Sequence, residues 1–355
     1  MRIGVPRETK EGERRVALQP PELALLAREG HDVRVEAGAG SGVGIGDGAY
    51  RGAGAAIVSS AEAWRSELIV KVKEILPADL PHVNGQAIFG FQQLPREPER
   101  TRALAARGVT AIAFEMVRDA AGGYPLLAPM SEIAGRMAIE VATRHLGRTP
   151  GHVLVLGAGS AGLGAARRAL DAGAAVTLLT RSEKSRRAAD KLLGAKARTG
   201  IASKDAIERA ALEADALVGA VLVVGEPTPK LVPRSLVARM KRGAMIVDVC
   251  IDGGGVAETS RPTTHAQPTY VEEGVIHYAV SNMPAAEPQA AAAALSRAAL
   301  PFVRELAGRG IGRAVRDNPG LRAAILLWKG RVNHRGIAEE AGLAYTPLSD
   351  SDLDR

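Results

Sequence analysis

An apolar strand, Val153–Leu156, runs directly into the glycine-rich turn Gly157–Gly162, and a helical pattern follows. In such a turn the first glycine permits the tight bend. The second lets the backbone approach a pyrophosphate, and the third lets helix and strand lie close together. The N–H groups and the positive dipole end of the following helix then face the phosphates. The order strand, glycine turn, helix therefore predicts a dinucleotide-binding turn at Gly157, Gly159 and Gly162.

The next expected strand, Ala175–Thr180, is followed by Arg181 and Ser182. At this position, about 20 residues further along, an NAD-selective site carries Asp or Glu, whose carboxylate accepts a hydrogen bond from the adenosine ribose. Thr180, Arg181 and Ser182 offer no carboxylate, and a guanidinium suits a 2′-phosphate. The sequence therefore favours NADP(H). The alternative is that Arg181 lies beside the adenine and NAD(H) binds as well.

The length of 355 residues predicts two domains, because single cores seldom grow beyond ~250–300 residues. Apolar strands alternate with helical patterns in two series, which is typical of parallel sheets covered by helices. We expect an α/β fold of two Rossmann-like domains with doubly wound, mostly parallel sheets and a cleft between them. Residues 1–128 plus 285–355 are expected to form the catalytic or substrate domain. Residues 129–284 are expected to form the dinucleotide-binding domain.

The expected elements follow from short apolar runs and from helical spacing. Strands are predicted over Ile3–Val5, Asp32–Glu36, Leu68–Val72, Ala87–Phe91, Thr110–Phe114, His152–Leu156, Ala175–Thr180, Ala216–Val221, Met245–Val249 and Ile276–Val280. Helices are predicted over Pro21–Glu29 and Glu99–Arg107, and over a long alanine-rich segment after Pro284. Ser131 is expected to cap a helix that runs to Leu146, because it precedes the first apolar position of that pattern.

Composition narrows the classes of partner. The net charge is +7, but the arginines are spread along the chain without interleaved aromatic residues that could stack on bases, so nucleic acid is not an expected partner. A single cysteine, Cys250, allows no internal disulfide and fits a reducing cytoplasm. No apolar run approaches the ~18 residues of a membrane span. We expect a cytoplasmic protein without a membrane partner, and no metal site.

Further motifs occur in a fixed order along nearly the whole chain. They are Gly4–Glu8, Glu13–Leu18, Lys71–Glu74, Leu127–Glu132, Val247–Gly254, Arg261–His265 and Asn282–Pro284. Together they resemble the alanine dehydrogenase family, whose fold is shared by the NAD-binding subunit of proton-translocating transhydrogenase. So many matches in order are specific, although each alone is weak. The resemblance also implies a homo-oligomer, a dimer or a hexamer.

The resemblance implies that Arg15 and Lys73 hold the carboxylate and the carbonyl oxygen of a 2-oxo acid. A guanidinium fork matches a carboxylate, and a cation stabilises an oxygen that gains negative charge. Asp252 would lie beside the nicotinamide and take part in proton transfer or imine stabilisation, and Asn282 would contact substrate and cofactor. The other expected cofactor contacts are Ser131, Ser160, Ala161, Val221, Leu231, Ile251 and Met283.

One position departs from the family. Its catalytic histidine belongs to a segment that aligns with Phe89–Leu94, and the matching residue here is Gln93. Glutamine can donate a hydrogen bond to the substrate, and we expect Gln93 to do so, but it cannot shuttle a proton near neutral pH. The connection before the cofactor strand, Leu146–Gly151, is also shorter than in the family. Both changes bear on the substrate.

These observations lead to an NAD(P)H-dependent oxidoreductase that transfers hydride to the carbon of an imine or a 2-oxo acid, with a substrate altered from alanine. Amination by free ammonia needs the proton transfer that histidine would supply, whereas reduction of a preformed imine needs less. A true alanine dehydrogenase, acting on pyruvate and ammonia, is the alternative. An alternative of another class is a cofactor-binding sensor or a transhydrogenase-like partner subunit.

Overall fold

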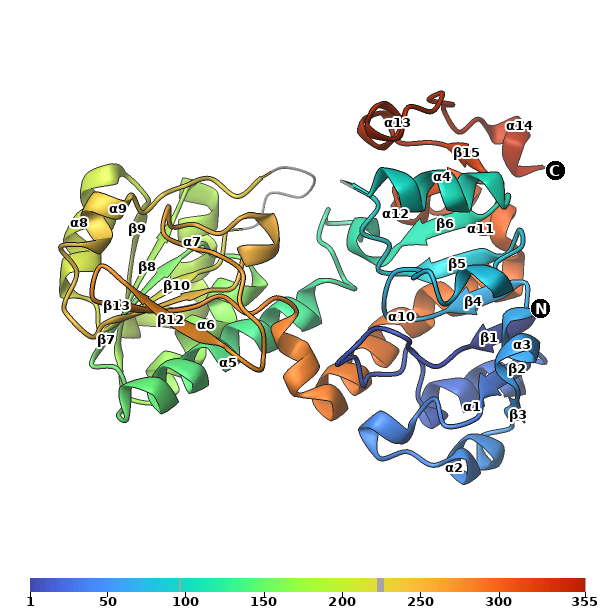
Figure 1. The fold of residues 1–355 in the computed structure, drawn as a ribbon, viewed down its shortest axis with the longest axis horizontal. Coiled ribbons are helices and arrows are strands. Elements are labelled where there is room, and N and C mark those ends of the chain that lie inside the picture. Colours follow the sequence, from blue (N-terminus) through green and yellow to red (C-terminus); the bar gives the residue numbers. More distant parts are fainter. Residues whose placement is uncertain (96, 222–226, 355) are drawn as a thin grey trace. The chain divides into compact units, whose positions relative to one another are not determined.

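The computed structural model describes residues 1–95, 97–221 and 227–354. The chain divides into two compact units (Figure 1). The discontinuous unit comprises Met1–Pro129 and Ala285–Arg355, and the central unit comprises Met130–Pro284. Each unit contains one mostly parallel sheet flanked by helices. The predicted α/β fold with two such sheets is confirmed.

The sheet of the discontinuous unit has eight strands within the described residues, in the order β15-β14-β6-β5-β4-β1-β2-β3. Strands β1 to β6 run parallel, and β14 and β15 continue the sheet antiparallel beyond β6. The order reverses between β1 and β4, which lie side by side although β2 and β3 separate them in the chain. The strands are β1 (Arg2–Val5), β2 (Asp32–Glu36), β3 (Ala56–Val58), β4 (Leu68–Val70), β5 (Ala87–Gly90), β6 (Thr110–Ala113), β14 (Ile325–Trp328) and β15 (Arg331–Val332).

The sheet of the central unit has seven strands in the part of the chain that is described, in the order β12-β13-β11-β10-β7-β8-β9. All neighbours are parallel except β12, which is antiparallel to β13. Here the order reverses between β7 and β10. The strands are β7 (His152–Leu156), β8 (Ala175–Thr180), β9 (Ala197–Ile201), β10 (Ala216–Gly219), β11 (Met245–Asp248), β12 (Thr269–Glu272) and β13 (Val275–Tyr278).

Helices connect these strands, and further helices lie in the C-terminal segment. Those of the discontinuous unit are α1 (Pro20–Arg28), α2 (Asp47–Gly52), α3 (Ser60–Trp64), α4 (Pro98–Ala106), α10 (Pro288–Arg309), α11 (Ile311–Asp317), α12 (Pro319–Ala323), α13 (Arg335–Ala341) and α14 (Asp350–Leu353). Those that follow α4 and precede α10 are α5 (Ala128–Leu146), α6 (Ser160–Asp171), α7 (Glu183–Leu193), α8 (Lys204–Glu213) and α9 (Arg234–Val237). Short 3-10 turns include η2 (Leu80–His82), η3 (Phe114–Met116) and η5 (Ile251–Gly253).

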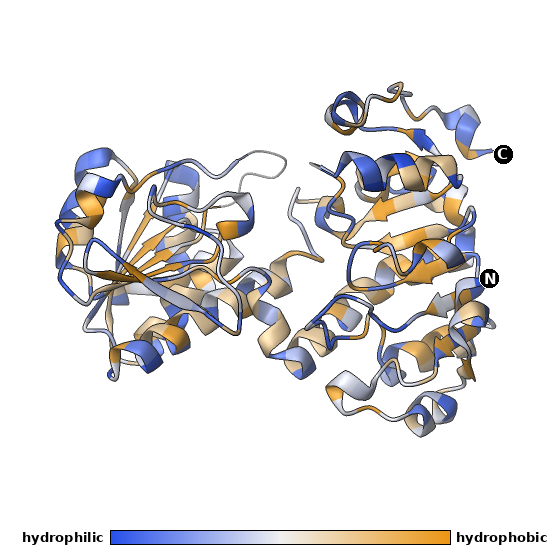
Figure 2. Cartoon of the chain, in the orientation of Figure 1, coloured by the Kyte–Doolittle hydropathy of each residue, from blue (hydrophilic) through white to orange (hydrophobic). Residues whose placement is uncertain are grey.

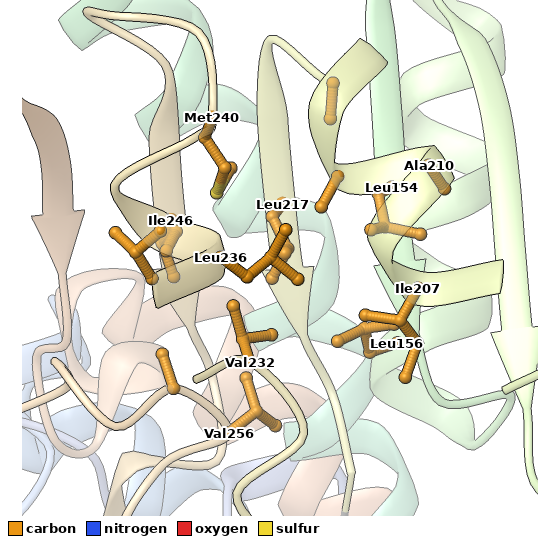
Figure 3. Close-up of a cluster of buried hydrophobic side chains, with 14 of the residues drawn as sticks. Leu154, Leu156, Ile207, Ala210, Leu217, Val232, Leu236, Met240, Ile246 and Val256 are labelled. Atoms are coloured by element: carbon orange, nitrogen blue, oxygen red, sulfur yellow. The ribbon is translucent and has the colours of Figure 1, made fainter. Parts of the chain in front are cut away.

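The strands carry the apolar residues that bury each sheet, whereas the helices are polar on one face (Figure 2). In the central unit, Leu154, Leu217 and Ile246 point from three neighbouring strands toward Ile207 of α8 and Leu236 of α9 (Figure 3). All of these side chains are buried. Apolar strands buried between helices are the usual basis of a parallel sheet, and here they keep the strand ends in register.

Helix α5 begins earlier than its sequence pattern predicts. It starts at Ala128, so Ser131 lies within the first turn and the prediction that Ser131 caps the helix is wrong. Proline is tolerated in a first turn because its missing N–H would have no helical acceptor there, and Pro129 therefore continues the helix. Gly135 of α5 and Gly164 of α6 let the two helices lie close together. A Cβ on Gly135 would lie 1.9 Å from the carbonyl oxygen of Ala161.

None of the helices in the described part of the chain is long and apolar enough to cross a membrane.

Candidate active site

The glycine turn of the central unit lies at the carboxyl end of β7, where the strand order reverses. Gly157 has a φ of 109°, and a Cβ there would lie 2.3 Å from the carbonyl oxygen of Ala220, which follows β10. A Cβ on Gly162 would lie 1.9 Å from the carbonyl oxygen of Gly157. Both distances are far shorter than a van der Waals contact, so only glycine fits these two positions. Ligands of doubly wound sheets bind at such a reversal.

Gly159 differs from these two glycines because it faces open space. A Cβ on Gly159 would meet no described atom within 4 Å. Gly159 precedes α6, whose first turn includes Ser160 and Ala161 and receives no side-chain cap from the described residues. A helix N-terminus with open donors and a positive dipole end fits a phosphate group. The residues of this cradle therefore fit the pyrophosphate of a dinucleotide.

The end of β8 carries no carboxylate. Thr180 is buried, and the Arg181 side chain is exposed and forms no hydrogen bond or ion pair with the described part of the chain. Ser182 caps α7, since its Oγ accepts a hydrogen bond from the backbone N–H of Ser185 at 3.2 Å. The nearby Glu183 is paired with Arg186 at 2.6 Å. The guanidinium of Arg181 is thus the charged group next to the strand end that has no such partner within the described residues.

Asp252 lies on η5, directly after β11, and its side chain is exposed. The loop that carries it is held by the buried Asp248. Its Oδ2 accepts hydrogen bonds from the Val256 N–H at 2.8 Å and the Ser260 hydroxyl at 2.5 Å. The Cys250 thiol donates to Oδ1 at 3.1 Å. Asp248 therefore fixes the turn, and Asp252 is left facing solvent.

The remaining predicted cofactor residues of the central unit occupy mixed environments. Val221 and Leu231 are partly buried against the core cluster of Figure 3. Ile251 and Met283 are buried, and Ser131 is half-buried in the first turn of α5. Asn282 has a φ of 57°, in the left-handed region. Asparagine is one of the few non-glycine residues that adopts this conformation readily, so Asn282 suits the sharp turn before η6 (Met283–Ala286).

In the discontinuous unit, the predicted substrate residues follow neighbouring parallel strands. Arg15 lies in the segment after β1, Lys73 after β4 and Gln93 after β5, and β1, β4 and β5 are adjacent. Arg15 is buried and forms a two-bond ion pair with Glu13, with Nη2 2.6 Å from Oε2. Burial would raise the pKa of Glu13, but the hydrogen bonds and charge of Arg15 outweigh it and lower that pKa to about 2.

Lys73 is also buried, but its ammonium has no hydrogen-bond or ion-pair partner among the residues described. Its Nζ lies 6.0 Å from the centre of the Phe91 ring. Burial, and then the positive charge of Arg15, lower the pKa of Lys73 below its ordinary value. Glu13 offsets the charge of Arg15, whereas the Lys73 ammonium lies in a partly desolvated place where it would attract an anion such as a 2-oxo acid.

A buried ion cluster that the sequence reasoning missed holds the backbone of this segment. Glu8 accepts hydrogen bonds from the N–H groups of Val72 at 2.6 Å and Lys73 at 3.2 Å. Lys71 Nζ lies 3.5 Å from Glu8 and 3.1 Å from Asp79. Burial would lower the pKa of Lys71, but the two carboxylates raise it. Glu8 thereby fixes the turn from which the Lys73 side chain extends.

Gln93 lies at the surface of the unit with a φ of 47°. Its backbone N–H donates a hydrogen bond of 2.8 Å to Glu115, which follows β6 on η3. The Gln92 N–H donates to the same carboxylate, at 3.1 Å to Oε1 and 3.2 Å to Oε2. Burial raises the pKa of Glu115, and these backbone hydrogen bonds and the charge of Lys73 only partly offset that effect.

Comparison with known families decides what kind of protein carries these residues. Residues 4–134 match the model described as alanine dehydrogenase/PNT, N-terminal domain, and residues 128–335 match alanine dehydrogenase/PNT, C-terminal domain. The chain belongs to the alanine dehydrogenase/PNT family. As a member of this family it is an oxidoreductase that uses a nicotinamide dinucleotide. The resemblance inferred from the ordered motifs is confirmed.

Proteins similar to this chain match it over nearly its whole length. It is 42% identical to the alanine dehydrogenase of Mycobacterium tuberculosis strain H37Rv over 98% of each chain. It is 40% identical to the alanine dehydrogenase of Bacillus subtilis strain 168, over 100% of this chain and 98% of that one. A solved structure of an L-alanine dehydrogenase matches with a TM-score of 0.90 and 39% identity, covering 96% of this chain and 99% of that one. A transhydrogenase structure from Sinorhizobium meliloti shares the fold, with 24% identity and a TM-score of 0.82 over 94% of this chain and 99% of that one.

The structure gathers several of the predicted site residues at two sheet edges and shows which residues support them. Arg15, Lys73 and Gln93 gather at the carboxyl edge of one sheet, and Gly157, Thr180 and Asp252 gather at the carboxyl edge of the other. Glu8, Glu13, Glu115 and Asp248 were not singled out as site residues. Glu8, Glu13 and Asp248 lie within recognised motifs, and that position was the only signal for them, whereas Glu115 lies in none of these motifs.

Proposed function

We propose that this chain is an alanine dehydrogenase, which acts on a CH–NH2 group and interconverts alanine with pyruvate and ammonia. The observation that carries the proposal is the pair of buried cations, Arg15 and Lys73, in the segments that follow the neighbouring strands β1 and β4. Relatives that are 40–42% identical over their full length are named alanine dehydrogenase. These relatives favour alanine over the altered substrate that Gln93 suggested.

Arg15 and Lys73 have complementary roles in this proposal. Glu13 holds the Arg15 guanidinium in one orientation, which suits it to bind a planar carboxylate. The Lys73 ammonium, whose charge is opposed by burial, stabilises the negative charge that develops on the carbonyl oxygen of pyruvate. Groups fixed in advance near developing charge contribute strongly to catalysis, because they need no reorganisation during the reaction.

The central unit supplies the residues that would hold the dinucleotide. The turn around Gly159 would take the pyrophosphate, and Asp252 would face the reacting end and stabilise the positive imine. When bound, the nicotinamide accepts the hydride from alanine or returns it to the imine.

We further propose a preference for NADP(H) within this function. The strand end at Thr180 lacks the carboxylate that would accept from a ribose 2′-hydroxyl, and the exposed Arg181 has no ion-pair partner within the described residues. A 2′-phosphate would pair with this guanidinium, since guanidinium and phosphate form two parallel hydrogen bonds. NAD-selective sites ordinarily carry an acidic residue at this place, and this chain has none there.

A second candidate is the reduction of a preformed imine, or of a 2-oxo acid with another side chain. The observation that favours it is Gln93, which stands where a proton-transferring histidine is expected. Reduction of a preformed imine omits the addition of ammonia and the loss of water, and those are the steps that need proton transfer most.

One assay separates the two candidates. The purified chain is given NADH or NADPH with pyruvate and ammonium, with larger 2-oxo acids and ammonium, and with cyclic imines. Pyruvate with ammonium is expected to give the highest kcat/KM. The proposal fails if an imine or a larger oxo acid is turned over at least about tenfold more efficiently. Reactions without ammonium are the control, because they detect simple reduction of the carbonyl group to an alcohol.

We also propose a cytoplasmic homo-oligomer, as the family resemblance implies. Sedimentation of the purified chain tests it, and a monomer at micromolar concentration would contradict it.

A further inference from the structure

The proposed function needs a group that exchanges protons at the substrate carbonyl, and Gln93 cannot be that group. We propose that Glu115 carries this proton and acts as a catalytic residue. This inference rests on the proposed alanine dehydrogenase reaction. It assigns to a carboxyl group after β6 the chemistry that a histidine after β5 would have performed.

The position of Glu115 supports this role. Strands β1, β4, β5 and β6 are consecutive neighbours in the sheet, and because they are parallel their carboxyl ends lie on one edge. Glu115 follows β6, so it lies on the same edge as Lys73 and Gln93. Lys73 follows β4 and Glu115 follows β6, with β5 between them, and the positive charge of Lys73 contributes to lowering the pKa of Glu115.

The hydrogen bonds of Glu115 leave one oxygen suited to carry a proton. Oε1 accepts from the Gln93 N–H at 2.8 Å and the Gln92 N–H at 3.1 Å. Oε2 accepts the longer branch from Gln92, at 3.2 Å, and the carboxylate also accepts from the backbone N–H of Glu115 itself. The carboxyl group is therefore anchored through Oε1. It can hold a proton on Oε2 without losing its strongest anchor, and the residue as a whole is half-buried.

The electrostatic surroundings also suit proton exchange. Burial is the largest influence on the pKa of Glu115 and raises it, while the Gln92 and Gln93 N–H groups and Lys73 lower it. A carboxyl group with a raised pKa holds its proton closer to neutral pH, as general acids do. The other charged groups near this loop are Arg100, whose Nη1 lies 3.5 Å from the Gln93 carbonyl oxygen, and its partner Glu97.

His82, the histidine nearest to Gln93 in the sequence, is not an alternative proton carrier. His82 ends η2, which precedes β5, so it lies toward the amino end of that strand, opposite to Gln93. Its ring is stacked on Trp64, with ring centroids 6.2 Å apart. A proton carrier is needed at the carboxyl edge, and Glu115 is already there.

The proton transfers balance as follows in the amination direction. Ammonium gives a proton to the Glu115 carboxylate, and the resulting ammonia forms a C–N bond to the carbonyl carbon of pyruvate while the π electron pair moves to oxygen. That oxygen takes one proton from the new ammonium group. It then takes the proton of Glu115 as the C–O bond breaks and water leaves, and the nitrogen lone pair forms the C=N bond. Pyruvate and ammonium thus give the iminium and water, and Glu115 returns to the carboxylate.

The test compares Glu115→Gln with a matched control, Glu99→Gln, which removes an exposed carboxylate on α4. Glu115→Gln is expected to lower kcat for pyruvate amination by ~10²–10⁴-fold, the usual contribution of a general acid–base group. The Kd for the dinucleotide should not change, because that site lies in the central unit. Glu99→Gln should match the unaltered chain in both measurements.

Rescue by histidine separates a proton-transfer role from a structural one. Gln93→His in the Glu115→Gln background should restore kcat at least about tenfold and bring in a pH limb near the histidine pKa of ~6.5. Gln93→His alone should change kcat by less than that. A loop that had merely lost its anchor would not recover in this way. If Glu115→Gln does not fold, the pH profile of Glu115→Asp decides, since a displaced carboxyl should lower kcat and shift its limb.

The outcomes distinguish the two proposals. Turnover of pyruvate and ammonium by the unaltered chain, with kcat unchanged in Glu115→Gln or with kcat and its limb unchanged in Glu115→Asp, overturns the role of Glu115 alone. Loss of kcat without rescue by Gln93→His also overturns it. No turnover by the unaltered chain overturns the alanine dehydrogenase proposal, and the role of Glu115 falls with it.

Discussion

Glu13 grips Arg15 through two hydrogen bonds, 2.7 Å from Nε to Oε1 and 2.6 Å from Nη2 to Oε2, and neither side chain is more than 1% exposed. A guanidinium paired in this way cannot rotate. Its orientation is therefore set before a substrate arrives, which spares the cost of ordering a long side chain at the moment of binding.

Replacing Glu13 with Gln should expose the cost of losing this pair. Removing one partner of a buried pair destabilises a protein by about 3–5 kcal/mol, and the KM for pyruvate should rise because Arg15 is released. Arg15 outweighs burial and lowers the pKa of Glu13 from 4.5 to about 2, so the stabilisation is present above pH 4.5 and is lost as the pH falls through about 2. Urea unfolding at several pH values measures it, with exposed Glu11→Gln as the control. A difference between the two variants that did not shrink toward pH 2 would contradict this account.

Gly159 and Gly162 make a matched pair for the cofactor cradle. Gly162→Ala should lower the Tm strongly, because its Cβ would lie 1.9 Å from the carbonyl oxygen of Gly157. Gly159→Ala has room for its Cβ and an ordinary φ of −80°, so its Tm should stay unchanged. Its dinucleotide Kd should nevertheless rise at least about tenfold, because the methyl group occupies the place of the pyrophosphate. Calorimetric titration measures this, and an unchanged Kd for Gly159→Ala would place the cofactor elsewhere.

Arg181→Ala tests the cofactor preference. The Kd for NADPH should rise by about 10- to 100-fold, which corresponds to ~1.4–2.8 kcal/mol, and the Kd for NADH should change little. Thr180→Asp should shift the preference the other way, because its carboxylate repels a 2′-phosphate and accepts from a 2′-hydroxyl. Exposed Lys184 is the matched cation, and Lys184→Ala should leave both constants unchanged. Equal losses for the two cofactors in Arg181→Ala would refute the assignment.

Asp248 ends β11 and Asp252 follows on η5. Replacing each with asparagine should have different effects. Asp252→Asn should leave the Tm unchanged, because the side chain is exposed, and should lower kcat. Asp248→Asn should lower the Tm, since an amide has one acceptor oxygen and cannot accept at both positions from the Val256 N–H, the Ser260 hydroxyl and the Cys250 thiol, and a lost buried hydrogen bond costs about 1–3 kcal/mol. Thermal melting and steady-state rates distinguish them. A large drop in Tm for Asp252→Asn would show that its carboxylate holds the loop together.

Lys73→Met should stabilise the chain while abolishing its activity. Burial and the charge of Arg15 lower the pKa of Lys73 from 10.5, so folding disfavours the ammonium. This penalty is fully present below the folded pKa, and it disappears as the pH rises through 10.5. Methionine of similar length should therefore raise the Tm at pH 7, and the gain should fade in strongly alkaline buffer. A lower Tm at pH 7 would mean that the ammonium is stabilised in the folded state.

Most of the strands that the sequence missed lie at the edges of the two sheets. β2, β7 and β8 were predicted with their observed bounds. The missed strands are β14, which lies inside the eight-stranded sheet, and β3, β9, β12 and β15, which are the four edge strands of the two sheets. An edge strand is only partly buried, as β9 with its Arg198, Thr199 and Gly200 illustrates. It therefore needs no continuous apolar run, and it leaves no pattern to find.

The same limit applies to the site. Gly157, Arg15 and Lys73 could be found because they lie in motifs with a chemical reason for each residue type. Glu115 could not, because it is separated from Gln93 by a whole helix, and only the pairing of β5 with β6 brings the two together. Sequence reasoning therefore argued against alanine as the substrate because Gln93 replaces the histidine. It did not consider the carboxylate of Glu115, to which the Gln93 N–H donates a hydrogen bond.

The sheet of the discontinuous unit takes strand β14 from a part of the chain that follows the entire central unit. β14 pairs with β6, and its Leu326 and Leu327 complete the buried cluster around β5 and β6. During synthesis, a ribosome therefore delivers all of residues 130–284 before the strand that covers β6. The central unit, whose strands are continuous in the chain, can fold in that interval. A nascent chain arrested before Ile325 would keep β6 as an open edge, ready to pair with a strand of another chain.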